Sequence, residues 1–327
     1  MKIAITGATG HLGSAIVPEL CKRNYVVKAL VRENEYSFAE MPVDIVHGDL
    51  LHRESLEALL LDCDALIHCA AVISINGDPL GIVHQTNVEG TKLVMEIAKQ
   101  RMVKRVVHIS SIHAYNQRPA GETLTEQREK VNNKAFAYDR SKKAGQEIAL
   151  AMNQPGMEVL VMNPTSIVGP HDHKPSKMGK VIIDLYLGRL PFVFDGGFDF
   201  CDCRDVACAV ANALTMGRAG ENYLLAGKWH SFKQLVQLIS KVSHKKINVA
   251  SLPPVFGKIG LPVIKLMAII NKTEPLYTGE ALEAIFGGNR KISSAKAKQE
   301  LHYSIRPFEE TIADTIKWFQ QNGYLVR

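Results

Sequence analysis

Three glycines at the end of the first predicted strand constrain the fold of this chain more than any other feature. The strand Lys2–Thr6 leads into Gly7, Gly10 and Gly13, and an apolar helical pattern, Leu12–Arg23, begins within the same turn. Glycines at this spacing let the backbone turn tightly and approach a ligand closely, while a helix that starts there directs unpaired N–H groups and its positive dipole end at the turn. The turn predicts a pyrophosphate-binding loop, and a glycine-rich turn without a ligand is the alternative.

Short apolar runs alternate with helical segments along the first half of the chain. Several runs are almost continuously apolar, as is typical of strands buried on both faces of a parallel sheet. Strand–helix alternation forms right-handed βαβ units, so we expect an α/β fold with a Rossmann-type doubly wound parallel sheet. The predicted strands are Lys2–Thr6, Val26–Val31, Asp44–His47, Ala65–Cys69, Arg105–Ile109, Glu158–Asn163 and Asn222–Leu225. The predicted helices are Leu12–Arg23, Arg53–Leu60, Thr86–Lys99, Ser141–Met152, Ser231–Val242 and Phe308–Gln320.

The length of 327 residues exceeds what one hydrophobic core normally supports, which is about 250–300 residues. After Asn163 the regular alternation gives way to a loop-rich segment that contains several prolines and glycines. We therefore expect a dinucleotide-binding Rossmann domain formed by residues 1–168 and about 196–240. A smaller C-terminal substrate lobe would be formed by residues 169–195 and about 241–327.

The composition is that of a soluble globular protein, with 46% hydrophobic and 22% charged residues. The formal net charge of +6 suits an anionic ligand but is too small to indicate nucleic-acid binding. The six cysteines form no C-x-x-C pair, so reduced thiols in the cytoplasm are the simplest interpretation, and no metal site is expected.

One later segment, Leu252–Ile270, is apolar enough to raise the question of a membrane. It contains Lys258, Pro262 and Lys265, which a membrane-spanning helix would have to bury, so we expect no stable membrane insertion. The segment would instead line the substrate pocket or form a subunit contact.

The end of the second predicted strand indicates which dinucleotide is bound. An NAD site usually has an acidic residue about 20 residues beyond the glycine turn, where it holds the ribose 2′-hydroxyl. This strand ends at Val31 and Arg32, and an arginine there can pair with the 2′-phosphate of NADP. We therefore favour NADP(H), with NAD(H) as the alternative if Glu33 or Glu35 holds the ribose.

Two further strand ends supply candidate contacts to a dinucleotide. Asp49, which precedes Leu50, follows the third strand, where its carboxylate can accept from the adenine amino group or cap a local turn. Cys69, Ala70 and Ala71 follow the fourth strand, and their small side chains permit close approach to a cofactor ribose.

A tyrosine and a lysine one helical turn apart are the candidate catalytic groups. Tyr138 and Lys142 are spaced i and i+4, which places them on one helical face. An ammonium group beside a phenol favours the phenolate and lowers the tyrosine pKa, so this tyrosine could exchange a proton with an oxygen on carbon. The strand Arg105–Ile109 ends in Ser110 and Ser111, where a hydroxyl could bond to the same oxygen.

Together these motifs resemble an extended short-chain dehydrogenase/reductase of the NAD-dependent epimerase/dehydratase superfamily. Within that superfamily the chain is most similar to the dihydroflavonol 4-reductase-like group, and the resemblance covers almost the whole chain. The motifs that carry it are Gly7–Gly13, Gly48–Leu50, His68–Ala71, Asn87–Thr91, His108–Ser111, Tyr138–Lys142, Asn163–Thr165, Val168–Pro170 and Asp202–Ala207.

The resemblance implies specific roles in catalysis. Tyr138 would be the general acid, and Lys142 would tune it and hold the nicotinamide ribose. Ser111, with Ser110 as the fallback, would orient the substrate oxygen. Asn87 would support the active-site helix and help to order water.

The same resemblance implies the cofactor contacts. Pro164 and Ser166 would border the nicotinamide and leave one face of its ring open to the substrate. The full set of predicted cofactor-binding residues is Gly7, Thr9, Gly10, His11, Leu12, Gly13, Arg32, Asp49, Leu50, Cys69, Ala70, Ala71, Tyr138, Lys142, Pro164 and Ser166.

Two departures from related enzymes bear on the reaction. Sugar-nucleotide epimerases of this type often carry an arginine for the nucleotide diphosphate where this chain has Phe198, and dehydratases place an acid pair where Ile112–His113 follow Ser111. We therefore predict an NADP-dependent oxidoreductase that reduces the carbonyl of a small-molecule ketone or aldehyde by hydride transfer. The alternative is a sugar-nucleotide epimerase or dehydratase with tightly bound NAD(P), in which Arg189 or Arg290 supplies the clamp.

Two histidines are weaker candidates for contact with the substrate. His113 lies beside the serine pair, and His171 lies in the loop after Pro170; a structural role is the alternative for each. A non-enzymatic sensor on the same fold is disfavoured, because such a protein would not need the proton chemistry of Tyr138 and Lys142. By analogy with relatives alone, we expect a homodimer.

Overall fold

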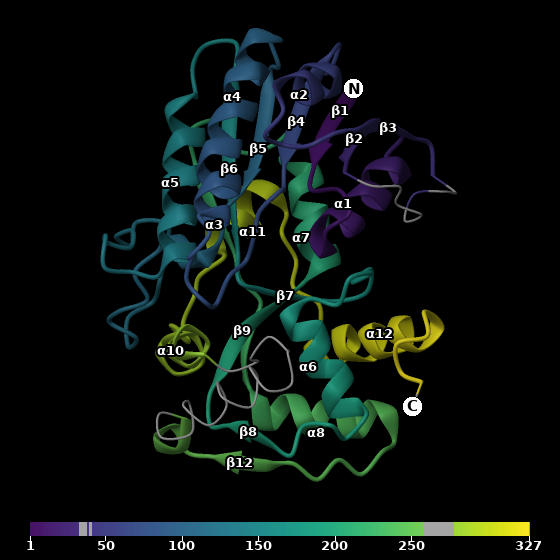
Figure 1. The fold of residues 1–327 in the computed structure, drawn as a ribbon, viewed down its shortest axis with the longest axis vertical. Helices are drawn as coiled ribbons and strands as arrows, with labels where there is room; N and C mark the ends of the chain where they lie inside the picture. Colours follow the sequence, from purple (N-terminus) through teal and green to yellow (C-terminus); the bar gives the residue numbers. More distant parts are fainter. Residues whose placement is uncertain (33–37, 39–40, 258–277, 327) are drawn as a thin grey trace.

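The fold is built on one seven-stranded parallel sheet (Figure 1). The computed structural model describes residues 1–32, 38, 41–257 and 278–326. The strand order is β10-β6-β5-β4-β1-β2-β3, and the pairings between neighbouring strands are parallel. The predicted doubly wound Rossmann-type sheet is therefore confirmed. Its strands are β1 (Lys2–Thr6), β2 (Val26–Val31), β3 (Val43–His47), β4 (Ala65–His68), β5 (Arg105–Ile109), β6 (Glu158–Pro164) and β10 (Asn222–Leu225).

Alternation along the strands explains why helices cover both faces of this sheet. In β1, Ile3 and Ile5 join the core on one face and Ala4 joins the core on the other, and all three are fully buried. The helices of the first face are α1 (His11–Lys22), α7 (Cys203–Asn212) and α11 (Ala295–Leu301). The helices of the second face are α2 (Arg53–Leu60), α4 (Gly90–Gln100) and α5 (Ala137–Ala151).

Two helices differ from their predicted extent in a way that affects the site. α5 begins at Ala137, earlier than predicted, so Tyr138 lies in its first turn. The predicted helix Thr86–Lys99 is divided into a π-helical turn, η2 (Gln85–Glu89), and α4. A π-turn is wider than an α-turn and is often found at functional sites, and this one contains Asn87.

A second group of elements lies beyond the carboxyl ends of the sheet strands and has its own hydrophobic core (Figure 1). This core combines aliphatic side chains with buried phenylalanines such as Phe194, Phe200 and Phe319. Its helices are α6 (Lys177–Tyr186), α8 (Phe232–Ser243), α10 (Gly279–Gly287) and α12 (Phe308–Gln321). Its strands form the sheet β11-β9-β7 and the pair β12-β8: β7 (Ser166–Val168), β8 (Phe192–Phe194), β9 (Gly197–Asp202), β11 (Lys228–Ser231) and β12 (Ala250–Leu252).

The boundaries between the Rossmann domain and the substrate lobe stay a prediction. The hydrophobic clusters support a change in where two helices are assigned. Leu301 of α11 packs in the core that contains α1 and α7, whereas Leu235 of α8 packs in the core of the second group. We therefore propose that residues 295–303 belong with the sheet and residues 232–243 with the substrate lobe.

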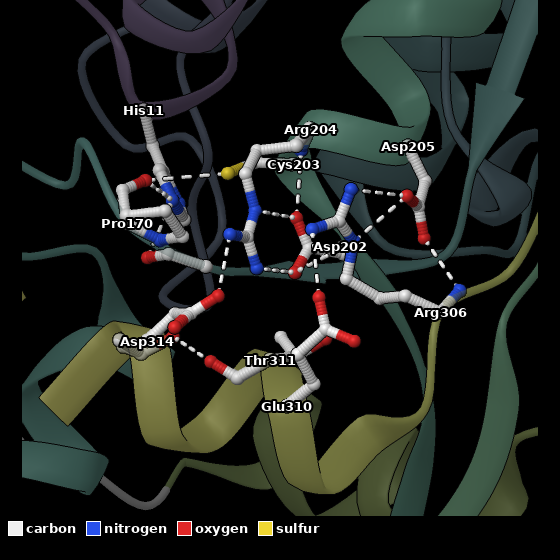
Figure 2. A network of polar contacts seen from close by, with 12 residues as sticks. His11, Pro170, Asp202, Cys203, Arg204, Asp205, Arg306, Glu310, Thr311 and Asp314 are labelled. Carbon is white, nitrogen blue, oxygen red and sulfur yellow. Dashed lines mark hydrogen bonds and ion pairs between the residues drawn. The ribbon is translucent and has the colours of Figure 1, made fainter.

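A network of charged side chains joins the start of α7 to α12 (Figure 2). The carboxylate of Asp202 accepts hydrogen bonds of 2.8 and 3.0 Å from the guanidinium of Arg204, which also donates to Asp314 at 2.6 Å. Arg306, which precedes α12, donates to Asp205 of α7 at 2.8 Å. Burial alone would raise the pKa of Asp202, but the hydrogen bonds from Arg204 and the charges of Arg204 and Arg306 together outweigh it and lower the pKa. Ion pairs therefore join the sheet helices to the second group of elements.

Parts of two predictions lie outside the described residues. These are Glu33 and Glu35, the alternative ribose-binding residues, and the portion of the apolar segment Leu252–Ile270 from residue 258 onward. In the described part of the chain, no helix has the length and apolar character needed to cross a membrane.

Candidate active site

A cavity of about 970 Å³ opens where four neighbouring strands of the sheet end. Ligands of open α/β sheets bind outside the carboxyl ends of the strands, and this volume is within the range of small-molecule and cofactor sites. Residues that follow β1, β4, β5 and β6 all contribute to its lining. The predicted site residues that it brings together are Gly7, Gly10, His11, Leu12, Gly13, Cys69, Ala71, Ser110, Ser111, His113, Tyr138, Lys142, Pro164 and Ser166.

The glycine turn has the form of a cradle for a phosphate-containing ligand. Gly7 has a φ of 71°, and a Cβ there would lie 2.5 Å from the backbone nitrogen of Ala70. A Cβ on Gly13 would overlap the carbonyl oxygen of Gly7, whereas the nearest atom to a Cβ on Gly10 would be 3.4 Å away. α1 begins at His11 with no side-chain cap, so its first N–H groups are available to an anion at the cavity. These residues fit the pyrophosphate of a dinucleotide.

Tyr138 and Ser111 meet at the wall of the cavity. The phenol of Tyr138 is hydrogen-bonded to the side chain of Ser111, and Ser111 is buried at the end of β5. Burial raises the pKa of Tyr138 to about 12, and the hydrogen bond with Ser111 opposes that rise. The predicted lowering of this pKa by Lys142 is therefore wrong, because loss of hydration dominates.

Lys142 lies one turn after Tyr138 and is 5% exposed. Its Nζ donates a hydrogen bond of 2.8 Å to the carbonyl oxygen of Ile109 at the end of β5. Burial lowers the pKa of Lys142 to about 8. The ammonium is thus fixed between α5 and the sheet, at the level of the cavity.

Asn87 supports the start of α5 from behind the cavity. Its side-chain oxygen accepts the N–H of Val72 at 2.7 Å, and its Nδ2 donates to the carbonyl of Val72 and to the hydroxyl of Ser141, both at 2.9 Å. Ser141 in turn donates to the carbonyl oxygen of Tyr138 at 2.7 Å. Asn87 therefore contacts the helix that carries Tyr138, and its supporting role in catalysis stays a prediction.

Five predicted cofactor residues lie outside the lining of the cavity. Arg32 is exposed at the end of β2. One carboxylate oxygen of Asp49 accepts the N–H of Leu51 at 2.9 Å, so Asp49 caps the local turn, as the alternative interpretation held. The five residues are Thr9, Arg32, Asp49, Leu50 and Ala70.

The lining of the cavity as a whole is more apolar than polar. Phe198 lies in this wall, and its ring centre is 5.8 Å from that of Phe232. The two arginines weighed as a diphosphate clamp, Arg189 and Arg290, both lie outside the lining, but Arg290 lies over the ring of the cavity residue Trp229 at 4.5 Å.

His113 and His171, the two weaker substrate candidates, are placed differently. His113 lines the cavity, and its Nδ1 is 2.9 Å from the carboxylate of Asp139, the residue after Tyr138. Its ring meets the ring of Tyr138 edge-on at 5.5 Å. His171 lies outside the lining, in a left-handed backbone conformation with a φ of 67°.

Asp139 and Asp199 are cavity residues that sequence reasoning missed. The carboxylate of Asp199 accepts the N–H of Gly227 at 2.7 Å and lies near the hydroxyl of Thr165. Burial raises the pKa of Asp199 to about 6, and the nearby Thr165 hydroxyl and the Gly227 N–H oppose the rise. The alternation of β9 gave no signal of this burial, because an aspartate between two phenylalanines normally faces solvent.

The side chain of His11 connects the glycine turn to the loop that leads to α6 (Figure 2). Its Nε2 lies 3.2 Å from the carbonyl oxygen of Gly169 and 3.1 Å from that of Pro170. The thiol of Cys203 donates to the same Pro170 carbonyl at 3.2 Å. The loop is therefore held between the first turn of α1 and the first turn of α7.

A parallel sheet of this order, with a glycine turn between β1 and α1 and a cavity at the strand ends, defines a Rossmann-type dinucleotide-binding protein. The chain belongs to the NAD-dependent epimerase/dehydratase family, whose model matches residues 3–226. This confirms the predicted superfamily. Members of the family include oxidoreductases, epimerases and dehydratases.

Several relatives match over nearly their whole length. The chain is 30% identical to sterol demethylase protein B of Methylococcus capsulatus, covering 99% of this chain and 100% of that protein. It is 27% identical to a Synechocystis protein named after dihydroflavonol 4-reductase, covering 98% and 95%. The crystal structure of the protein gox2253 matches with a TM-score of 0.85 and 30% identity, covering 100% and 99%.

Enzymes that act on sugar nucleotides share the fold. A UDP-glucuronic acid 4-epimerase from Bacillus cereus, solved with NAD, matches with a TM-score of 0.78 and 18% identity, covering 98% of this chain and 100% of that one. At this identity the match concerns the fold alone.

Proposed function

We propose that this chain is an NADP-dependent oxidoreductase that reduces the carbonyl group of a ketone or aldehyde. The observation that carries the proposal is the hydrogen-bonded pair of Tyr138 and Ser111 beside an apolar wall that contains Phe198. A substrate with a diphosphate would need a cation at that wall, because burying its charge against a phenyl ring is costly. An uncharged carbonyl compound has no such requirement.

Each polar group at the site has a role in this reaction. Ser111 donates a hydrogen bond to the substrate carbonyl oxygen, and Tyr138 protonates that oxygen as it becomes an alkoxide. A nicotinamide dinucleotide, when bound, supplies the hydride that adds to the carbonyl carbon. Because burial raises the pKa of Tyr138 to about 12, its phenol is protonated at neutral pH and ready to act as the donor. Lys142 holds positive charge near the phenolate that is left.

The choice of NADP over NAD rests on Arg32, while the glycine turn would serve either dinucleotide. The turn would hold the pyrophosphate with the N–H groups of the first turn of α1. Arg32 is exposed at the end of β2, where it is free to close over a 2′-phosphate. NAD is the alternative if no such phosphate is bound.

Sugar-nucleotide epimerisation or dehydration is the second candidate, because Arg290 stacks on Trp229 at the edge of the cavity. The diphosphate of a sugar nucleotide would have to bind Arg290, because Phe198 has no charge with which to bind it. The name of the Synechocystis relative favours carbonyl reduction over this candidate.

A ligand panel separates the two candidates. The melting temperature is measured with NADP, NAD, UDP-glucose and dTDP-glucose, and NADPH oxidation is then followed with a set of aliphatic and aromatic ketones. We expect stabilisation by NADP and ketone-dependent oxidation of NADPH. Stabilisation by a sugar nucleotide without ketone turnover would establish the second candidate.

The proton donor is tested by Tyr138→Phe, which should bind NADPH normally and lose at least about a hundredfold in kcat. Tyr303→Phe is the matched control, since Tyr303 is a buried tyrosine of the sheet core that does not line the cavity. Equal turnover by Tyr138→Phe and the wild type would remove Tyr138 from the mechanism.

A further inference from the structure

A continuous chain of buried hydrogen bonds runs behind the cavity from the glycine turn to the catalytic helix. It begins at Thr6, the last residue of β1, whose hydroxyl accepts the N–H of Ala70 at 3.4 Å and lies 2.7 Å from Nδ1 of His68. Nε2 of His68 lies 3.0 Å from the hydroxyl of Thr91. That hydroxyl donates to the backbone carbonyl oxygen of Asn87 at 2.7 Å. Thr6 and His68 are fully buried, and Thr91 and Asn87 are at most 3% exposed.

The directions of these hydrogen bonds fix the protonation of His68. A carbonyl oxygen only accepts, so the single proton of the Thr91 hydroxyl is used on Asn87, and Thr91 must accept from His68. Nε2 of His68 therefore carries a proton. Burial lowers the pKa of His68 to about 3, so the ring is neutral and Nδ1 is left to accept from the hydroxyl of Thr6. Lys142 and His108 are the charged and titratable groups near this ring.

The second half of the chain reaches Tyr138. Asn87 lies in the π-helical turn η2, and its Nδ2 donates to the hydroxyl of Ser141, which donates to the backbone carbonyl of Tyr138. Gly145 lets α5 approach η2 closely, because a Cβ at this position would lie 2.8 Å from the carbonyl oxygen of Asn87. The backbone of the catalytic turn is thus bonded to the same network as His68.

We propose that His68, as the neutral Nε2–H tautomer, is a positioning residue that orients Thr91 and Asn87 and thereby fixes the catalytic turn of α5. The proposal rests on the proposed function, because Tyr138 is its target. His68 does not line the cavity, so it acts through other residues and not on a substrate. A replacement that cannot donate from the Nε2 position leaves the hydroxyl of Thr91 without its donor in a buried site, and Asn87 is then free to shift.

The tautomer is tested without any substrate. The ¹⁵N spectrum of the histidine side chains is recorded between pH 5.5 and 8, and the His68 signals are assigned by their loss in His68→Gln. We expect the pattern of a neutral ring protonated on Nε2 throughout this range. A ring protonated on Nδ1, or one that becomes charged within the range, would overturn the proposal.

The positioning role is tested by two substitutions that separate the ends of the ring. The amide of His68→Gln can donate near the Nε2 position, whereas His68→Asn can accept near the Nδ1 position but does not reach Thr91. The assay uses a ketone that supports NADPH oxidation by the wild type. We expect the kcat of His68→Asn to be about tenfold to a hundredfold below that of the wild type, with little change in its KM for NADPH. The kcat of His68→Gln should lie much closer to the wild-type value. Equal kcat for the two variants would refute the role.

Thr91 gives a second test if the histidine variants fold poorly. Thr91→Val removes the hydroxyl and Thr91→Ser restores it, so kcat should fall in the first and recover in the second. Thr315→Val is the matched control, because Thr315 is a buried threonine of α12 that makes the same hydrogen bond, 2.6 Å to the carbonyl oxygen of Thr311. Equal losses in Thr91→Val and Thr315→Val would mean that the effect is only structural.

Hydrogen exchange at the first turn of α5 provides a readout that does not need turnover. Exchange of the amides of residues 140–142 should be faster in His68→Asn and Thr91→Val than in the wild type or Thr315→Val. If no ketone is reduced, the proposed function is wrong, but the exchange rates still show whether His68 and Thr91 fix the first turn of α5. If ketones are reduced and exchange is unchanged in all the variants, the positioning role fails alone.

Discussion

The buried carboxyl group of Asp199 should make the stability of this protein decrease as the pH rises. Its side chain lies between Thr165 and Gly227 in the cavity wall, and burial raises its pKa from 3.8 to about 6. Because the folded-state pKa is the higher one, the unfolded chain ionises first as the pH increases, and folding is penalised progressively between about pH 4 and pH 6. Above that range the penalty is constant at about 3 kcal/mol, at 1.36 kcal/mol for each pKa unit.

Asp199→Asn removes the ionisation and keeps an oxygen that can accept the N–H of Gly227. The free energy of unfolding of the variant minus that of the wild type should therefore increase with pH, by about 2 kcal/mol between pH 4.5 and pH 7.5. Urea denaturation at several pH values measures this difference. Asp62→Asn, at an exposed turn, is the control for the substitution itself. A difference for Asp199→Asn that is constant with pH, or that decreases, would refute the reasoning.

Three further predictions concern the turn, the lysine and the ion-pair network. Gly13→Ala should cost about 1–3 kcal/mol by urea denaturation, because its Cβ overlaps the Gly7 carbonyl, whereas Gly10→Ala should keep the fold and weaken NADPH binding in calorimetry. Because burial lowers the pKa of Lys142 to about 8, its ammonium is lost above that pH, and kcat for ketone reduction should fall as the pH rises through about 8. Arg204→Leu removes the two guanidinium donors to buried Asp202 and should lower the free energy of unfolding by about 1–3 kcal/mol, again measured in urea.

The central sheet could be predicted from the sequence because most of its strands, apart from the partly exposed edge strand β3, are buried on both faces. A nearly continuous apolar run of the length of Val26–Val31 can be neither an exposed strand nor an amphipathic helix, and the structure has the same bounds for it. The predicted strand ends then indicated which residues line the cavity, because the residues that follow parallel strands lie at the same edge of the sheet. Ser111 and Cys69 were found in this way and line the cavity.

The properties that depend on burial could not be predicted in the same way. The spacing of Tyr138 and Lys142 indicated that they share a helical face, but the direction of the Tyr138 pKa shift depends on how much water the fold excludes. The wide turn at Asn87 has the same apolar pattern as an ordinary helix, so periodicity extended the helix through it. The contact of His113 with Asp139 required α5 to begin at Ala137, earlier than its apolar pattern indicates.

The packing of α11 limits how this protein can be divided into fragments. The family match ends at residue 226, yet Leu301 and Tyr303 are buried in the core that α1 and α7 share, and Ser294 bonds to the backbone of Ala226. A fragment that stops at the family boundary would leave the apolar side of α7 uncovered in water and would tend to aggregate. The residue that follows β10 is also hydrogen-bonded to a side chain 68 positions later, so this side of the nucleotide-binding half is complete only when the C-terminal segment is present.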